Sequence, residues 1–158
     1  MKIGVEVRLA GDAGDLLADA RAFEAAGADS LWVVGREDQD PWTLLAALAA
    51  VTWRARLVAL DSSERPEALA TVERLSRGRL VVATRDGDMI TLPAAEGDAE
   101  RWARSDFPAG RPAWKELRAK LEAEGFAGIA IPNDPRLLDL LRNPDTEDDR
   151  EDLKLAFG

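Results

Sequence analysis

The chain of 158 residues contains no cysteine and no histidine. Without cysteine it can form no disulfide, no thiolate zinc site and no cysteine nucleophile, and this composition fits a reducing compartment. Without histidine it also lacks the imidazole on which Ser-His and Cys-His catalysis depends. We therefore expect a cytoplasmic protein that performs neither thiol nor triad chemistry.

Long apolar runs are absent as well. No stretch reaches 18 uncharged apolar residues, and Met1-Lys2 leads directly into a strand-like run, so we expect neither a transmembrane helix nor a signal peptide. The net charge of −9 disfavours binding to nucleic acid or to an anionic membrane surface.

The chain has 46% hydrophobic and 32% charged residues, as soluble globular domains do. We expect one α/β domain over 1–142 and an acidic C-terminal tail over 143–158. The acidic run 145–152 lacks the spaced oxygens and the glycine of a calcium loop, so no metal site is expected.

Short strand-like runs alternate with longer helical ones, which is the pattern of βα units around a parallel sheet. The expected strands are 2–9, 30–34, 56–60, 80–84, 89–92 and 127–131, and the expected helices are 13–26, 41–52, 66–76, 112–124 and 135–142. This predicts about six strands, four or more of them parallel, in a reduced or open TIM-barrel-like arrangement. A doubly wound sheet is the alternative, because alternating βα units alone do not decide whether a sheet closes.

The helix expected over 41–52 is apolar on every side, after an N-cap at Asp40 and proline at its first position. Such a helix is buried on more than one side. A neighbouring helix or another subunit can supply the second cover, and we expect a homo-oligomer.

The pattern changes after Thr84. Asp86-Gly87 is a tight-turn dipeptide between two strand-like runs and predicts a hairpin where a full barrel has a helix. The segment 93–110 is expected to be a loop, with one helical turn at about 98–104.

Ligands of parallel α/β proteins bind at the carboxyl ends of the strands, so the loops there define the candidate site. Glu6 and Arg8 lie on the non-aliphatic face of the first strand. If that face lines a barrel interior or an oligomer seam, the two charges must pair, and they become candidates for contact with an anionic ligand. If the strand lies at an edge, the same face meets water.

Two further charged loops belong to this rim. Arg36-Glu37-Asp38 follows the second strand and is either a carboxylate-bearing part of the site or a solvated loop before the next helix. Asp61, with Ser62, Ser63 and Arg65, follows the third strand and offers either a phosphate site or an N-cap before Pro66.

Three segments resemble the N-terminal part of the luciferase-like flavin or deazaflavin monooxygenases: the join Ala20-RAFEAAGADSLW-Val33, the helix Asp40-PWTLLAALAAV-Thr52 and the join Leu75-SRGRLVV-Ala83. The resemblance covers about the first 84 residues. It implies a TIM-barrel ancestry and FMN or deazaflavin as a possible cofactor. The chain departs from the family in length, because such a barrel needs about 250 residues, and Arg36-Glu37-Asp38 stands where these enzymes often carry histidine.

The resemblance therefore transfers no catalytic residue, and two functions remain. The first is a shortened, non-catalytic binding or interaction module that takes a small-molecule ligand. The second is a flavin-dependent oxidoreductase whose site is completed by oligomerisation, with Glu6, Arg8, Arg36 and Asp61 facing the cofactor, since the cofactor itself supplies the difficult chemistry.

Overall fold

The structure is a computed structural model that describes residues 1–63, 65–87, 89–93 and 97–143. The expected tail lies outside the described residues beyond Asn143. The elements follow one another in the order β1 (Lys2–Glu6), α1 (Ala13–Ala25), β2 (Ser30–Val34), α2 (Pro41–Val51), β3 (Arg56–Leu60), α3 (Pro66–Ser76), β4 (Leu80–Val82), β5 (Thr84–Asp86), β6 (Met89–Leu92), β7 (Glu100–Arg104), α4 (Arg111–Ala123), β8 (Gly128–Pro132) and α5 (Pro135–Arg142).

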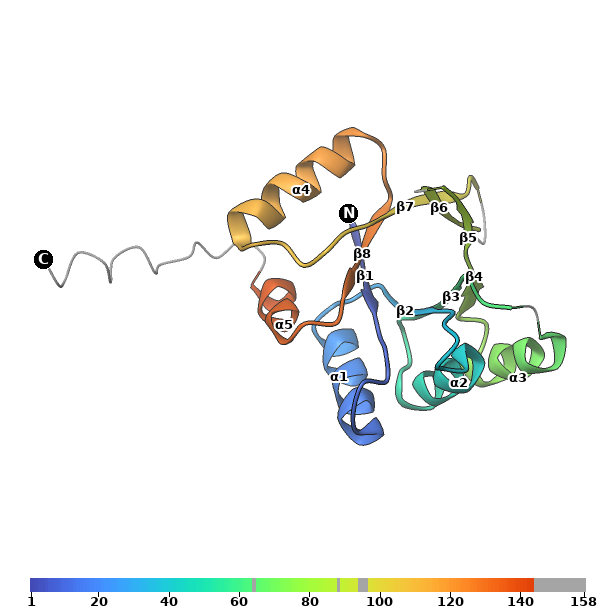
Figure 1. The fold of residues 1–158 in the computed structure, drawn as a ribbon. Helices are drawn as coiled ribbons and strands as arrows, with labels where there is room; N and C mark the ends of the chain where they lie inside the picture. Colours follow the sequence, from blue (N-terminus) through green and yellow to red (C-terminus); the bar gives the residue numbers. More distant parts are fainter. Residues whose placement is uncertain (64, 88, 94–96, 144–158) are drawn as a thin grey trace, which may run out of the picture.

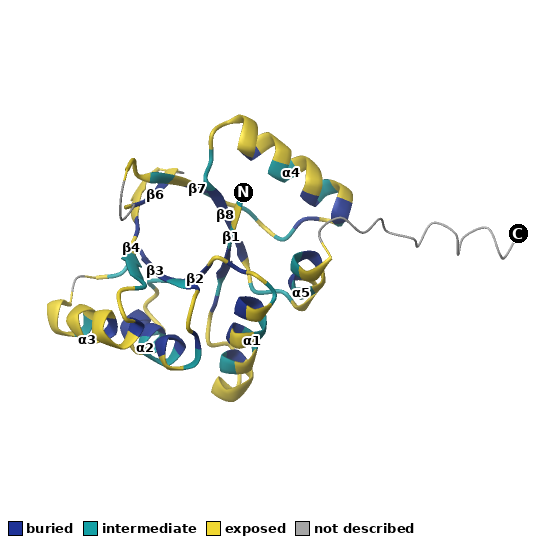
Figure 2. Ribbon diagram, turned by 180° about the vertical axis from the view of Figure 1, so that it is seen from behind, coloured by how far each residue is buried: buried dark blue, intermediate teal, exposed yellow. Residues whose placement is uncertain are grey.

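The strands form one eight-stranded sheet in the order β4-β3-β2-β1-β8-β7-β6-β5. The sheet curls into a nearly closed ring with the helices outside it (Figures 1 and 2). The five pairs from β4 through β3, β2, β1 and β8 to β7 are parallel, whereas β6 is antiparallel to both β5 and β7. The expected α/β class is confirmed, while the doubly wound alternative and the expected number of six strands are wrong.

One continuous stretch of chain joins the two ends of the ring. β4 and β5 are separated only by Ala83, and β4 pairs with β3 while β5 pairs with β6. The sequence predicts a single strand here, but the strand changes partner at its middle residue. The predicted hairpin follows at once, with Asp86 opposite Met89.

The expected helices and strands of the βα units form within a few residues of the predicted bounds. Asp40 caps α2 by accepting a hydrogen bond from the backbone N–H of Thr43 at 3.1 Å, and Asp134 caps α5 in the same way through Arg136. Gly27 and Gly125 take up positive φ angles just after α1 and α4. The first strand is shorter than expected and ends at Glu6, so Arg8 lies beyond it.

The expectation of a loop with a helical turn at 98–104 is wrong, because Glu100–Arg104 is strand β7. β7 pairs in parallel with β8 and antiparallel with β6. The sequence does not show the alternation of apolar and polar residues that indicates a strand, because Glu100 and Arg104 on the inner face of β7 are charged. Only Trp102 on this face is apolar.

Two layers of buried apolar side chains stabilise the ring. The outer layer packs the sheet against the helices, as Val5, Leu31 and Ile129 do against Phe23 and Leu45. The inner layer fills the ring itself and consists of Trp32, Val58, Leu60, Ala83, Ile90, Leu92, Trp102 and Ala130. Each large apolar side chain buried in this way contributes about 1.5–3 kcal/mol relative to exposure.

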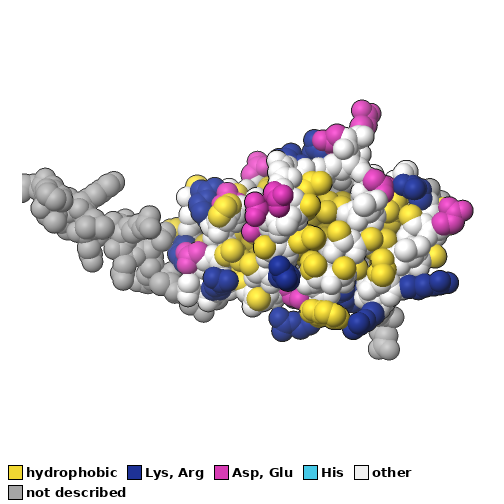
Figure 3. Space-filling view, turned by 90° about the horizontal axis from the view of Figure 1, so that it is seen from below, with side chains coloured by type: hydrophobic (Ala, Val, Ile, Leu, Met, Phe, Trp, Pro, Cys, Tyr) yellow, Lys and Arg dark blue, Asp and Glu magenta, His cyan; other side chains and the backbone are white. Residues whose placement is uncertain are grey.

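Helix α2 is only partly covered. Trp42, Leu45 and Leu48 are buried against the sheet and the flanking helices, whereas Leu44 is half-buried and Ala50 is exposed. Figure 3 shows hydrophobic side chains gathered on this helical face of the molecule, with charged side chains around them. Within the described part of the chain, every helix is too short or too polar to span a bilayer.

Candidate functional site

The middle of the ring is filled by two tryptophans. Trp32 and Trp102 are fully buried, with ring centroids 5.2 Å apart and planes tilted by 50°. Two glycines make room for them: a Cβ on Gly128 would lie 2.6 Å from the Trp102 ring, and one on Gly4 would lie 2.8 Å from Cδ1 of Trp32. The ring is therefore a packed core rather than a channel, and a ligand can bind only at its ends.

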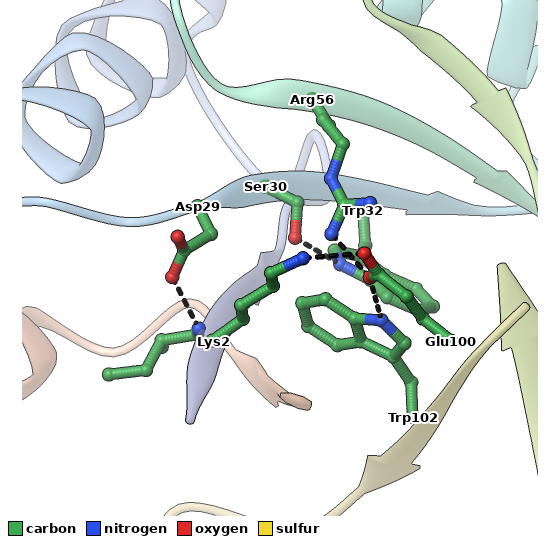
Figure 4. A network of polar contacts seen from close by, with 8 residues as sticks. Lys2, Asp29, Ser30, Trp32, Arg56, Glu100 and Trp102 are labelled. Carbon is green, nitrogen blue, oxygen red and sulfur yellow. Dashed lines mark hydrogen bonds and ion pairs between the residues drawn. The ribbon is translucent and has the colours of Figure 1, made fainter. Parts of the chain in front are cut away.

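The amino end of the ring contains a polar network around Glu100 (Figure 4). This carboxylate accepts hydrogen bonds from Lys2 Nζ at 2.5 Å, Arg56 Nη2 at 2.8 Å and Trp102 Nε1 at 2.9 Å. Burial alone would raise the pKa of Glu100, but the bonds from Arg56, Lys2 and Trp102 outweigh it and lower the pKa to about 2. Because Lys2, Arg56 and Trp102 all donate to this one carboxylate, the network ties β1, β3 and β7 together at the amino end of the ring.

A cavity of about 410 Å³ lies at the other end, where the parallel strands have their carboxyl ends. We call it the mouth cavity. Its wall includes Glu6, Arg8, Val34, Arg36, Arg104 and Asn133. These residues come from the ends of β1, β2 and β7 and from the loop after β8, so the parallel pairing brings together residues that are far apart in the sequence.

Glu6 and Arg104 form a two-pronged ion pair in this wall. Arg104 Nη2 donates to Oε2 of Glu6 at 2.7 Å, and Arg104 Nε donates to Oε1. The pKa of Arg104 is raised by the hydrogen bonds to Glu6 and, further, by the charges of Glu6, Asp61 and Asp106. The expectation that Glu6 pairs with Arg8 inside a barrel is wrong, because β1 ends at Glu6 and the cation that faces it comes from β7.

The other two arginines of the mouth cavity are accessible. Arg8 is exposed, and its guanidinium has no hydrogen bond or ion pair with any residue that the structure describes. Arg36 Nε contacts Asp38 Oδ1 at 3.2 Å, and both side chains are about half exposed or more, so this pair is weak. Arg8 and Arg36 can therefore turn toward a ligand at little cost.

Asp61 does not line the mouth cavity but lies beside it. Its carboxylate pairs with Arg85, with Oδ2 at 2.8 Å from Nη2, and its charge acts on Arg104. Of the four predicted site residues, Glu6, Arg8 and Arg36 share one wall and Asp61 is a neighbour. The N-cap interpretation of this loop is wrong, since α3 begins after Arg65 without a side-chain cap and Arg65 pairs with Asp40.

Two residues of the site were missed from the sequence. Arg104 lies in the segment that we expect to be a loop, because the charged residues on the inner face of β7 leave no hydrophobic alternation to indicate a strand. Gln39 also lines the mouth cavity, and no pattern distinguishes it from other polar loop residues.

Guanidinium groups form paired hydrogen bonds with carboxylates and phosphates. Three of them line this one cavity, and Arg104 is already paired with Glu6 while Arg8 and Arg36 are accessible. Among the residues that the structure describes, no group of three or more acidic side chains is arranged to hold a metal ion.

No family model matches this sequence, and no solved structure matches the chain.

Proposed function

We propose that this protein is a non-catalytic binding module, a shortened relative of the luciferase-like monooxygenases with a reduced TIM-barrel-like fold, and that it holds a small anionic molecule in the mouth cavity. The relationship is supported by the order of the first three βα units and by helices that lie outside the ring. The location is supported by the general preference of parallel α/β folds for ligands at the carboxyl ends of the strands.

The observation that supports an anionic ligand is the charge of the cavity wall. The whole chain has a net charge of −9, yet the wall contains the three cations Arg8, Arg36 and Arg104 and the single anion Glu6. Arg8 has no partner among the described residues. The volume of about 410 Å³ is within the usual range for sites that bind small molecules.

Two features favour binding over catalysis. The carboxylate in the wall of the mouth cavity, Glu6, is engaged with Arg104, and the neighbouring Asp61 is engaged with Arg85, so neither of these two is free to act as a general base. Below them, Trp32 and Trp102 fill the space in which a substrate would be enclosed. A site without a free acid or base and without an enclosed chamber is suited to holding a ligand.

A flavin fits this cavity only in part. The guanidinium groups suit its phosphate, but the apolar wall consists of small side chains such as Val34 and Pro132 and offers no slot for three fused rings. We therefore derive no step through a flavin, and flavin uptake becomes an outcome that distinguishes the two functions.

The proposal is tested by titrating the full chain with inorganic phosphate and with succinate in a calorimeter at low ionic strength. We expect binding that Arg8→Gln weakens about tenfold and that added salt weakens further, because an exposed guanidinium acts mainly through charge. Arg74→Gln, an exposed arginine on α3, is the matched control and should bind like the original protein.

Two results would contradict this function. One is the absence of any anion binding in the original protein, and the other is anion binding that Arg8→Gln leaves unchanged. Stoichiometric uptake of FMN or of a deazaflavin, seen as a yellow protein, would instead support the flavin-dependent oxidoreductase.

A further inference from the structure

A second hollow, of about 390 Å³, lies between helices α1 and α2 next to the mouth cavity. We call it the helix groove. Its apolar lining includes Leu9, Leu16, Leu17, Leu44 and Ala47. It belongs to the helical face on which hydrophobic side chains gather (Figure 3).

The acidic side chains at the edge of the helix groove are already engaged. Asp40 caps α2 through Thr43 and pairs with Arg65 at 2.9 Å, and Asp38 pairs with Arg36. The pKa of Asp40 is lowered, first by the hydrogen bond from the Thr43 side chain and, more weakly, by Arg65. Asp40 is therefore engaged within the protein, while the exposed Asp38 has only its weak contact with Arg36 and stays in water at the rim. The lining of the groove is otherwise mainly apolar.

One side chain separates the two hollows. Gln39 lines both the mouth cavity and the helix groove. Its amide nitrogen donates to the carbonyl oxygen of Leu9, and its amide oxygen accepts from the Leu9 N–H at 3.4 Å. Although Arg8 and Leu9 are neighbours in the sequence, Arg8 lines the mouth cavity and Leu9 lines the helix groove.

We propose that the ligand is an amphiphile, an aliphatic chain that ends in an oxyanion. This inference rests on the proposed function. The oxyanion lies in the mouth cavity against Arg8, Arg36 and Arg104, and the chain crosses Gln39 into the helix groove. The arrangement matches the two chemistries of the site: guanidinium groups recognise carboxylate or phosphate, and an apolar groove gains affinity from buried methylenes.

The test is a series of n-alkyl phosphates, from inorganic phosphate to octyl phosphate, each titrated into the full chain below its aggregation concentration. We expect the dissociation constant to fall by about two- to fourfold per methylene, since a fully buried methylene is worth about 0.8 kcal/mol. The affinity should stop rising with chain length once the alkyl chain fills the groove.

Two variants test whether the alkyl chain of the ligand lies in the helix groove. Leu44→Gln should remove most of the dependence on chain length and leave the affinity for inorganic phosphate unchanged. Ala47→Trp, which places a large side chain at a half-buried position of the groove wall, should do the same by filling the space, so the test does not depend on one variant folding. Met89→Gln on β6, another accessible apolar position, is the matched control.

The possible failures can be told apart. If inorganic phosphate binds but longer chains bind no better, the amphiphile is wrong and the anion site stands. If the alkyl phosphates bind to Arg8→Gln as well as to the original protein, the alkyl chain alone accounts for binding to the apolar face and the phosphate group contributes nothing. This result would overturn the proposal. If no phosphate binds at all, the proposed function fails as well.

Two other occupants would also overturn the proposal. A second copy of the chain in the groove would appear as a dimer that Ala47→Trp dissociates and octyl phosphate does not. A lipid surface would appear as binding to vesicles of anionic phospholipid without binding to monomeric octyl phosphate.

Discussion

Gly35, directly after β2, lies against the backbone of Asp61, directly after β3. A Cβ on Gly35 would overlap the carbonyl oxygen of Asp61 and would lie 2.8 Å from its carbonyl carbon. Asp61 has a φ of 52°, in the left-handed region that side chains rarely adopt. The close approach fixes the position of the Arg36 loop relative to the loop that carries Asp61.

We expect Gly35→Ala to destabilise the fold by about 1–3 kcal/mol, because the obstructing atoms are backbone and cannot rotate away. Anion affinity should fall in the same variant, since Arg36 is the next residue. Gly11→Ala is the control, as a Cβ there meets nothing within 4 Å, and chemical denaturation of the two variants gives the comparison. Equal stability for both would contradict the close approach.

A second prediction concerns the pH dependence of Glu100→Gln. The pKa of Glu100 is depressed to about 2 from an ordinary value of 4.5. The ionised carboxylate therefore stabilises the folded state fully above about pH 4.5, and this contribution disappears as the pH falls toward 2. The contribution is at most about 3 kcal/mol. We expect Glu100→Gln to unfold more readily than the original protein at pH 7 and the difference to shrink below pH 4.5.

Glu116→Gln, at an exposed position on α4, is the control for this measurement and should follow the original protein at every pH. A difference for Glu100→Gln that stays constant from pH 7 to pH 3 would contradict the network around Glu100.

A third prediction concerns Glu24, a buried carboxylate at the end of α1. It accepts hydrogen bonds from the backbone N–H groups of Trp53, Arg54 and Ala55, the shortest at 2.7 Å to Arg54. Burial raises the pKa of Glu24, but these bonds prevail and the pKa is lowered. We expect Glu24→Gln to cost about 1–3 kcal/mol, because a neutral amide oxygen accepts these bonds more weakly.

Thermal unfolding of Glu24→Gln beside Glu73→Gln, a similar change at an exposed position of α3, checks this expectation. Identical midpoints for the two variants would mean that Glu24 does not hold the connection between α2 and β3.

A fourth prediction is the homo-oligomer expected from the apolar character of α2. Ala50 is exposed on this helix, and a carboxylate there would be buried without a partner if a second copy covered the face. We expect sedimentation at micromolar concentration to show a dimer whose dissociation constant Ala50→Glu raises at least tenfold. Ala119→Glu on α4 is the control, and a monomeric original protein would contradict the prediction.

The sequence predicts the βα units well because their apolar residues repeat at the spacing of a helix or a strand and their ends carry capping residues. The segment Ser30–Val34 is strand β2 over its whole predicted length, and Asp40 begins the helix that it is expected to cap. Local signals of this kind need no knowledge of the rest of the fold.

The candidate site was predicted only in part, because its central contact is not local. Glu6 and Arg104 are separated by 98 residues, and nothing in the sequence near either residue identifies the other. Strand β7 is hard to predict for the same reason. Its inward-facing residues Glu100 and Arg104 are charged, and their hydrogen-bond partners come from other strands. Hydrophobic periodicity cannot detect a strand whose inner face is made of ion pairs.

The ring also has a consequence for synthesis on the ribosome. β1, which precedes the other strands of the described chain, pairs with β8 through Lys2 opposite Gly128 as well as with β2. One edge of β1 therefore remains unpaired until nearly the whole described chain has been made, and an unpaired edge can join a strand of another chain. The nascent protein therefore has to protect this edge of β1 until β8 has been made.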